Sequence, residues 1–317
     1  MSNKIAILGH QQITKYVTEF LLKNNIVIDC IIGLKKKSEE EITDYFDIQS
    51  FCSENKIDYY HPDKYSLKSA KDIDFFSKGN FDLLLVVGWS RLVPEEILSI
   101  INKSSIGWHG GMFKPPRCRG RAVVNWALIE GKKKFYVYTM SLKPGIDCGD
   151  IYLMEHTYFN IFDDSQSAYF KMSVVVSDMY LNIINNYNKL TPVPQSKSKP
   201  TYLPKRSPEN SGVSWLKPTI EIYNFIRALN DPFPNAFTCY ENNFVYIKKA
   251  IPFMQKNELK NISPGKVYHV FNNNIFTVGC LDGLLLVQEF ESSSDFYPKC
   301  NLSFKLESGS QLDCPTY

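Results

Sequence analysis

The chain has 317 residues, of which 44% are hydrophobic and 22% charged, a composition that is typical of globular proteins and excludes a disordered chain. A chain of this length is expected to form two domains. The formal net charge of +3 does not by itself indicate a nucleic-acid-binding protein.

The first elements predict a parallel sheet. Residues 4–9 (KIAILG) are typical of a short apolar strand, residues 13–25 of a helix and residues 26–33 of a second buried strand. This strand–helix–strand order favours parallel pairing with a right-handed crossover. Gly9 is followed by His, Gln and Gln, so the glycine-rich fingerprint of dinucleotide-binding enzymes is absent.

The next part of the chain continues this alternation. Residues 35–46 form a charge-rich connector, and residues 81–89 (FDLLLVVGW) form a continuous apolar strand of the kind found in the centre of a parallel sheet. The other expected helices are residues 47–57, 64–76, 93–100, 120–131 and 163–190. The other expected strands are residues 103–109, 134–142 and 150–159.

The composition changes after residue 190. Residues 191–212 are rich in proline, lysine and serine, which is a linker composition. We therefore expect a first domain of residues 1–205 and a second domain of residues 206–317. Residues 215–230 predict a helix, and the short β-rich runs after it predict a small antiparallel barrel.

Three predicted strand ends supply residues that could perform chemistry. They carry Arg91, His109, Asp147 and Asp150, and active groups of open α/β sheets lie just beyond the carboxyl ends of strands. A histidine can take a proton from an amine nucleophile, and a carboxylate hydrogen-bonded to it would fix its tautomer and stabilise its cation. This reasoning leaves open that His109 is an ordinary loop histidine.

Two further hypotheses concern the same sheet edge. His10 follows the first strand and either lines the pocket or is a plain loop residue. A metal site formed by His109, Cys118 and Cys148 would have a spacing that matches no common ligand pattern, so we expect no metal.

A basic segment precedes the helix of residues 120–131. It contains Lys114, Arg117, Arg119 and Arg121, and both arginine forks and a helix N-terminus favour phosphate or carboxylate ligands. The neighbouring glycines allow the backbone to approach a bound anion. The alternative is a solvated basic loop.

Together these motifs resemble the folate-dependent formyltransferases. The matching residues, in chain order, are His109, Pro116, Arg119–Gly120, Trp126–Leu128 and Gly145–Ile151. The resemblance implies a Rossmann-like formyl-transfer domain with a smaller, mainly β, barrel-like C-terminal domain. It also implies N10-formyltetrahydrofolate as the cofactor that donates the formyl group.

The resemblance implies a role for several residues. His109 would be the general base and Asp147 its partner, while Gly107 occupies the place of a family asparagine that steadies the oxyanion. Protonated His109, a backbone N–H or Asn125 could substitute for that asparagine. The implied cofactor-binding residues are Gly88, Trp89, Arg91, Leu92, Val93, Gly145, Ile146 and Asp147. The implied substrate-binding residues are Trp108, Gly110, Phe113, Arg117, Arg119, Gly120 and Arg121.

The expected acceptor is the primary amine of a nucleotide-linked amino-deoxy sugar, a precursor of a bacterial surface glycan such as lipopolysaccharide. The loop from His109 to Pro116 is longer than the usual family loop, which concerns the choice of substrate. The alternatives are methionyl-tRNA formyltransferase, a non-catalytic folate- or nucleotide-binding protein, and hydrolysis of the formyl donor by water.

The remaining expectations concern partners and location. We expect a cytoplasmic protein, because the N-terminus lacks the apolar core of a secretory signal and none of the eight cysteines forms a Cys-x-x-Cys pair. The apolar runs are shorter than a membrane span, so no membrane partner is expected. The expected partner is a small nucleotide sugar rather than a nucleic acid, and a homodimer is left open.

Overall fold

The structure is a computed structural model that describes residues 3–35, 44–255, 261–293, 296–310 and 314. The chain forms two compact units. The first consists of Met1–Gly120, Lys134–Thr157 and Tyr169–Tyr202, and the second of Arg121–Lys133, Tyr158–Ala168 and Leu203–Tyr317. The second unit thus includes two segments that precede residue 205. The domain boundary expected at residue 205 stays a prediction.

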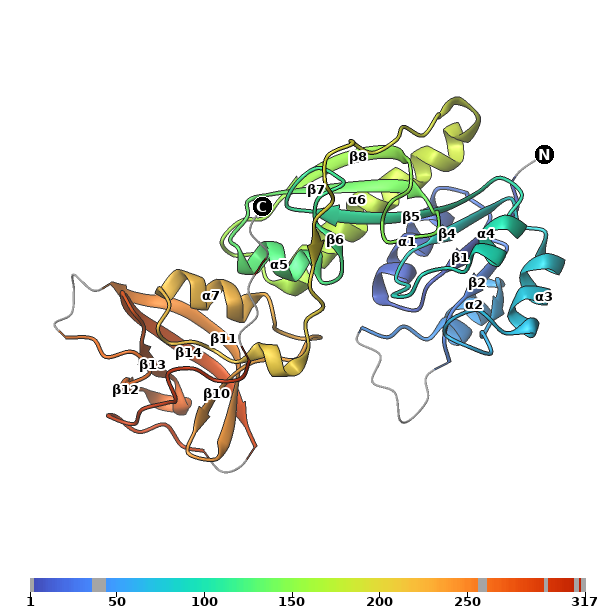
Figure 1. Cartoon of the computed structure of the whole chain (residues 1–317). Coiled ribbons are helices and arrows are strands. Elements are labelled where there is room, and N and C mark those ends of the chain that lie inside the picture. The colour runs from blue at the N-terminus through green and yellow to red at the C-terminus, as the bar shows by residue number, and fades with distance from the viewer. Residues whose placement is uncertain (1–2, 36–43, 256–260, 294–295, 311–313, 315–317) are drawn as a thin grey trace. The chain divides into compact units, whose positions relative to one another are not determined.

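The first unit contains a seven-stranded sheet (Figure 1). Its strands are β1 (Ile5–Leu8), β2 (Cys30–Ile32), β3 (Asp58–Tyr60), β4 (Leu83–Val86), β5 (Ser104–Gly111), β7 (Lys134–Ser141) and β8 (Ile151–Tyr158). They lie in the order β3-β2-β1-β4-β5-β7-β8. The pairs from β3 to β5 are parallel, and β5 pairs with β7 in antiparallel register. The parallel sheet predicted from the sequence is confirmed, and its order reverses between β1 and β4.

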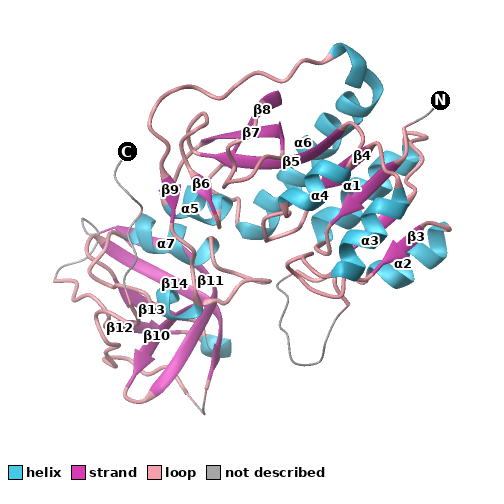
Figure 2. Cartoon of the chain, turned by 45° about the vertical axis from the view of Figure 1, so that its right-hand side comes forward, coloured by secondary structure: helices cyan, strands magenta, loops and turns pink. Residues whose placement is uncertain are grey.

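Helices flank this sheet, as Figure 2 shows. They are α1 (Gln12–Lys23), α2 (Ile48–Asn55), α3 (Ala70–Gly79), α4 (Glu95–Ile100) and α6 (Ser165–Asn186). Ser69 caps α3 by accepting a hydrogen bond from the Asp72 N–H at 3.0 Å. Phe76 of α3 and Ile97 of α4 join alternate residues of β1, β2 and β4 in one buried cluster. On α6, the Tyr180 hydroxyl donates to the Val86 carbonyl at 2.9 Å, which ties this helix to β4.

The second unit is mainly β. Helices α5 (Val123–Ile129) and α7 (Thr219–Arg227) accompany a five-stranded antiparallel sheet of order β10-β11-β14-β13-β12. These strands are β10 (Ala236–Tyr240), β11 (Asn243–Gln255), β12 (Val267–Val270), β13 (Phe276–Gly279) and β14 (Gly283–Ser292). Trp215 is fully buried here, and its indole N–H donates to the Thr238 hydroxyl at 2.9 Å. The expected antiparallel β structure is confirmed.

The proline-rich segment does not behave as a free linker. Residues up to 202 belong to the first unit. Val193 and Ile151 exchange both backbone hydrogen bonds at 2.8 Å, and the Arg119 N–H donates to the Thr201 carbonyl at 2.9 Å. Beyond it, β9 (Tyr202–Leu203) pairs with β6 (Arg119–Gly120). We call residues 193–201 the strap.

Two sequence expectations remain, one for the charge-rich connector and one for membrane-spanning helices. Most of the charge-rich connector, residues 36–43, lies outside the described residues. Within the part of the chain that is described, no helix is long and apolar enough to cross a membrane.

Candidate active site

His109 lies on β5 and is 7% exposed. Its Nε2 is 2.9 Å from the backbone carbonyl oxygen of Cys118. A carbonyl oxygen only accepts hydrogen bonds, so Nε2 must carry the hydrogen of the neutral ring. The nitrogen that can take up a further proton is therefore Nδ1.

Asp147 faces that second nitrogen. Its Oδ2 is 3.6 Å from Nδ1 of His109 and accepts a hydrogen bond from the Gly120 N–H at 2.9 Å. The distance to His109 is longer than a hydrogen bond. The expected hydrogen bond from the imidazole to the carboxylate is therefore absent, and the backbone of Cys118 orients the ring instead. The carboxylate still lies on the Nδ1 side of the ring.

Three residues that the sequence reasoning missed surround this pair. The side-chain amide of Gln195 donates a hydrogen bond to the Asp147 carbonyl, and the Thr201 hydroxyl accepts one from the Cys118 N–H. Tyr138 lies opposite His109 in the β5–β7 register, with ring centroids 5.7 Å apart. Burial, with the nearby Asp147 carboxylate, raises the pKa of Tyr138 far above its usual range, so its phenol stays neutral.

The residues expected to bind the donor lie on two loops that both start at one hydrophobic cluster. Trp89 and Val93, which follow β4, and Leu142, which follows β7, pack in this cluster. Beyond it, Leu92 is 59% exposed and Ile146 is 45% exposed. Large apolar side chains exposed on two loops that begin at the same cluster fit a flat, partly apolar ligand such as a pterin.

Other features of these loops concern shape and charge. Gly88 has a φ of 75°, a conformation that favours glycine, and Gly145 has a φ of 121°. The Arg91 guanidinium lies 4.6 Å from the centre of the Tyr65 ring. The expected contacts of these residues with the donor stay a prediction.

His10 is buried among aromatic rings at the end of β1. Its ring packs edge-to-face on Trp89 at 5.2 Å and on Tyr65 at 5.6 Å between centroids. Burial lowers the pKa of His10 from 6.5 to about 4. It is therefore a neutral packing residue at pH 7. Among the described residues, its Nδ1 has no hydrogen-bond partner.

Gly107 shares the face of β5 that carries His109, because side chains two residues apart point the same way. A Cβ at Gly107 would lie 2.7 Å from Cδ2 of Leu142. Asn125, which could have supplied the missing oxyanion donor, belongs to the second unit. Its amide nitrogen donates to the Ala228 carbonyl at 2.7 Å, and its part in steadying an oxyanion stays a prediction.

A groove of about 710 Å³ lies beside β7 and β8 in the first unit. Phe113, Arg117 and Tyr136 line it, together with strap residues. The Arg117 guanidinium lies 4.0 Å from the centre of the Phe113 ring. Tyr136 is opposite Gly111 in the register and lies on the same face of the sheet as His109, although His109 and Asp147 do not themselves line the groove.

The other predicted substrate residues have different surroundings in the structure. Trp108 and Gly110 alternate with His109 along β5 and face the opposite side of the sheet, so neither residue is directed at His109 and Asp147. Arg121 lies in the second unit, whereas Nη2 of Arg119 donates to Oε1 of Gln195 at 2.7 Å. Of the predicted substrate side chains, only Phe113 and Arg117 line the groove.

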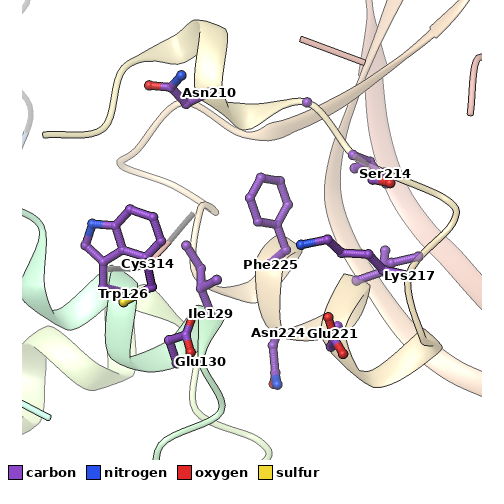
Figure 3. Close-up of a pocket in the computed structure, with 13 residues that line it drawn as sticks. Trp126, Ile129, Glu130, Asn210, Ser214, Lys217, Glu221, Asn224, Phe225 and Cys314 are labelled. Atoms are coloured by element: carbon purple, nitrogen blue, oxygen red, sulfur yellow. The ribbon is translucent and has the colours of Figure 1, made fainter. Parts of the chain in front are cut away.

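A second cavity, of about 320 Å³, lies within the second unit. In the view of Figure 3, the Phe225 ring lies between Trp126 and Lys217, with Asn224 below Phe225 and Glu221 below Lys217. None of the residues expected to bind donor or acceptor lines this cavity. We therefore place the candidate active site in the first unit.

Comparison with known sequences identifies the class of protein. The sequence model of the formyl transferase family matches residues 3–183, and that of the formyl transferase C-terminal domain matches residues 205–295. The methionyl-tRNA formyltransferase of Clostridium novyi (strain NT) is 30% identical over 249 residues, which cover 77% of this chain and 77% of that protein.

Solved structures share the fold. HypX from Aquifex aeolicus, in complex with tetrahydrofolic acid, has a TM-score of 0.68 at 18% identity and covers 93% of this chain. This chain spans only 45% of HypX. An N-formyltransferase from Helicobacter canadensis, in complex with folinic acid and dTDP-3-aminofucose, has a TM-score of 0.64 at 16% identity, over 92% of this chain and 100% of that one.

The chain belongs to the formyl transferase family. It is an enzyme of formyl transfer, and the formyl donor of this family is N10-formyltetrahydrofolate. The family and the fold class expected from the sequence are both confirmed.

Proposed function

We propose that the enzyme formylates the primary amine of a nucleotide-linked amino-deoxy sugar, a precursor of a bacterial surface glycan such as lipopolysaccharide. N10-formyltetrahydrofolate is the donor, held between the loop of Gly88–Val93 and the turn of Gly145–Asp147. His109 and Asp147 perform the proton transfer.

The reaction needs a base for the amine proton. The donor supplies an electrophilic formyl carbon. The acceptor amine bonds to that carbon first, so that its oxygen takes up negative charge, and the bond from the carbon to N10 breaks afterwards. Nδ1 of His109 takes the proton from the amine, because Nε2 already carries a hydrogen that it donates to the Cys118 carbonyl. The Asp147 carboxylate, 3.6 Å away, stabilises the resulting imidazolium. The protonated ring can then return a proton to N10.

The groove lined by Phe113, Arg117 and Tyr136 carries the proposal of a nucleotide-linked acceptor. Phe113 and Tyr136 offer aromatic faces for a base or sugar, and Lys114 and Arg117 offer cations for phosphates. These two cations are the only charged residues that line the groove among the described residues. A concave site of this size that joins aromatic and cationic groups fits a small phosphorylated ligand.

Methionyl-tRNA is the second candidate acceptor. The sequence relatives favour it, since the Clostridium novyi protein at 30% identity is a methionyl-tRNA formyltransferase. The charge of the chain favours the sugar, because 36 basic residues are nearly balanced by 33 acidic ones. The two acceptors differ in how their binding should respond to salt.

One experiment compares the candidates. The full chain is incubated with N10-formyltetrahydrofolate and a panel of nucleotide-linked amino sugars, or with charged initiator tRNA, and products are read by the mass gain of one formyl group. We expect formylation of an amino sugar that varies little between 50 and 200 mM salt. Formylation of the tRNA alone, falling steeply with salt, would overturn the proposed acceptor. Donor hydrolysis without any acceptor would point to the hydrolytic alternative.

A further inference from the structure

We propose that Gln195 is a positioning residue for formyl transfer, and that the strap (residues 193–201) holds both groups that flank His109. The inference rests on the proposed roles of His109 and Asp147. It concerns a segment that lies between the two family matches, which end at residue 183 and begin again at residue 205.

The first tether runs from Gln195 to the Asp147 turn. Nε2 of Gln195 donates to the carbonyl oxygens of Asp147 at 2.8 Å and of Gly149 at 2.9 Å. Both hydrogens of one amide thus hold the backbone of a turn in which Asp147 has a φ of 46°. A non-glycine residue in this conformation needs its surroundings to hold it in place.

The same side chain extends the link to the basic segment. Oε1 of Gln195 accepts a hydrogen bond from Nη2 of Arg119 at 2.7 Å. The N–H of Gly120, the next residue, donates to Oδ2 of Asp147 at 2.9 Å. The carboxylate is therefore fixed from its backbone by Gln195 and from its oxygen by Gly120, within one closed set of hydrogen bonds.

The second tether runs from Thr201 to the other partner of His109. The Thr201 hydroxyl accepts from the Cys118 N–H at 3.0 Å, and the Thr201 carbonyl accepts from the Arg119 N–H at 2.9 Å. Cys118 has a φ of 64°, and its carbonyl receives Nε2 of His109. The strap thus fixes the acceptor that selects the His109 tautomer.

The strap is also a wall of the groove proposed for the acceptor. Pro194, Gln195, Ser196 and Ser198 line it. Gln195 therefore lines the groove while its amide is hydrogen-bonded to the turn that carries Asp147. A side chain in this place aligns the catalytic pair with whatever fills the groove, and small displacements of reacting groups cost rate more than they cost binding.

The test uses Gln195→Leu, which keeps the size of the side chain and removes its hydrogen bonds. We expect kcat to fall about 10- to 100-fold while the KM for the donor changes less than about threefold. Gln195→Glu, which cannot donate to the two carbonyls but still accepts from Arg119, should show the same loss. Lys197→Ala, an exposed change on the same strap, is the control and should keep the wild-type kcat.

A double-mutant cycle separates positioning from a merely structural role. If Gln195 acts through Asp147, Gln195→Leu should lower kcat far less in an Asp147→Asn background than in the wild type. Equal losses in both backgrounds, or a kcat that falls only in step with the melting temperature, would overturn the inference. If Asp147→Asn alone keeps the wild-type kcat, the proposed catalytic pair is wrong instead.

Thr201 gives an independent check on the second tether. Thr201→Val has nearly the same shape but leaves the Cys118 N–H without its acceptor, whereas Thr201→Ser retains the hydroxyl. We expect Thr201→Val to lower kcat about tenfold and Thr201→Ser to restore most of it. Equal kcat values for these two variants would remove Thr201 from the proposal.

Discussion

Nε2 of His109 lies 2.9 Å from the carbonyl oxygen of Cys118, and this one contact decides which ring nitrogen can act as a base. Because the carbonyl needs a donor, the hydrogen of the neutral ring is placed on Nε2 and the lone pair on Nδ1. The Asp147 carboxylate is on the Nδ1 side, at 3.6 Å. The neutral ring is therefore oriented by the Cys118 carbonyl, while a different group, the Asp147 carboxylate, lies beside the nitrogen that carries the lone pair.

His109→Gln tests this division directly. The glutamine amide can still donate to the Cys118 carbonyl, so the fold of the loop should persist, but no group can take the amine proton. We expect kcat to fall at least about 100-fold, with donor binding retained. Steady-state formylation and fluorescence titration with the donor measure the two effects.

The matched control for that variant is His61→Gln. Nδ1 of His61 contacts the Gly33 carbonyl at 2.8 Å, so this histidine also bonds the backbone but has no place in the proposed site. Its kcat should stay at the wild-type value. A His109→Gln enzyme that formylates as fast as the His61→Gln enzyme would show that His109 is not the base.

Gly107→Asn introduces the asparagine that the family resemblance implies at this position. The new Cβ would lie 2.7 Å from Cδ2 of Leu142, at the flexible end of a side chain that can rotate away. We expect folding with a loss of about 1 kcal/mol in unfolding free energy, and a kcat equal to or above that of the wild type. Urea unfolding and steady-state rates measure these quantities.

Gly110→Asn provides the contrast on the same strand. Its Cβ would approach the Phe135 ring and lie 3.0 Å from the backbone oxygen of Tyr136, which cannot rotate away. We expect this variant to be destabilised more strongly than Gly107→Asn. If Gly107→Asn loses its activity with an unchanged melting temperature, the glycine itself is required and the role given to this position is wrong.

The sequence predicted the pair but not its supports. His109 and Asp147 could be predicted from their positions at strand ends and from the family motif. Both signals depend on the identity of the side chain, which the sequence shows directly. The Cys118 carbonyl leaves no such pattern, since every residue has a backbone oxygen. Gln195 could not be singled out from the sequence, because the residues around it have the proline, lysine and serine content of a linker. The position of Trp108 facing away from His109 was predictable, because adjacent residues of one strand face opposite sides.

Arg117→Met tests the groove as the acceptor site. Methionine keeps much of the contact with the Phe113 ring, which lies 4.0 Å from the guanidinium, but removes the positive charge. If the phosphates of the acceptor bind here, we expect its KM to rise about tenfold while the KM for the donor is unchanged. Initial rates with each substrate varied in turn give both constants.

The control for Arg117→Met removes a charge elsewhere in the first unit. Lys15 on α1 is 44% exposed in its side chain and lies 4.0 Å from Glu19, so Lys15→Met alters the net charge by the same amount outside the groove. Both KM values of this variant should match the wild type. A rise in the acceptor KM of similar size in both variants would mean that the effect comes from overall charge.

His10 should make stability depend on pH below 6.5. Burial holds its folded pKa at about 4, so the folded state keeps His10 neutral while the unfolded chain protonates it between pH 6.5 and 4. The unfolded state therefore binds more protons in this range, and the contribution to stability is complete above pH 6.5 and is lost as the pH falls toward 4. A change of pKa from 6.5 to about 4 corresponds to about 3 kcal/mol.

The experiment compares urea unfolding of the wild type and of His10→Phe at pH 7 and at pH 4.5. Phenylalanine keeps the edge-to-face packing on Trp89 and Tyr65 but cannot be protonated. We expect the wild type to lose about 2 to 3 kcal/mol more than the variant between the two pH values. His269→Phe, in the second unit, should retain the wild-type dependence. Equal losses in wild type and His10→Phe would show that His10 is already protonated, or exposed, in the folded protein.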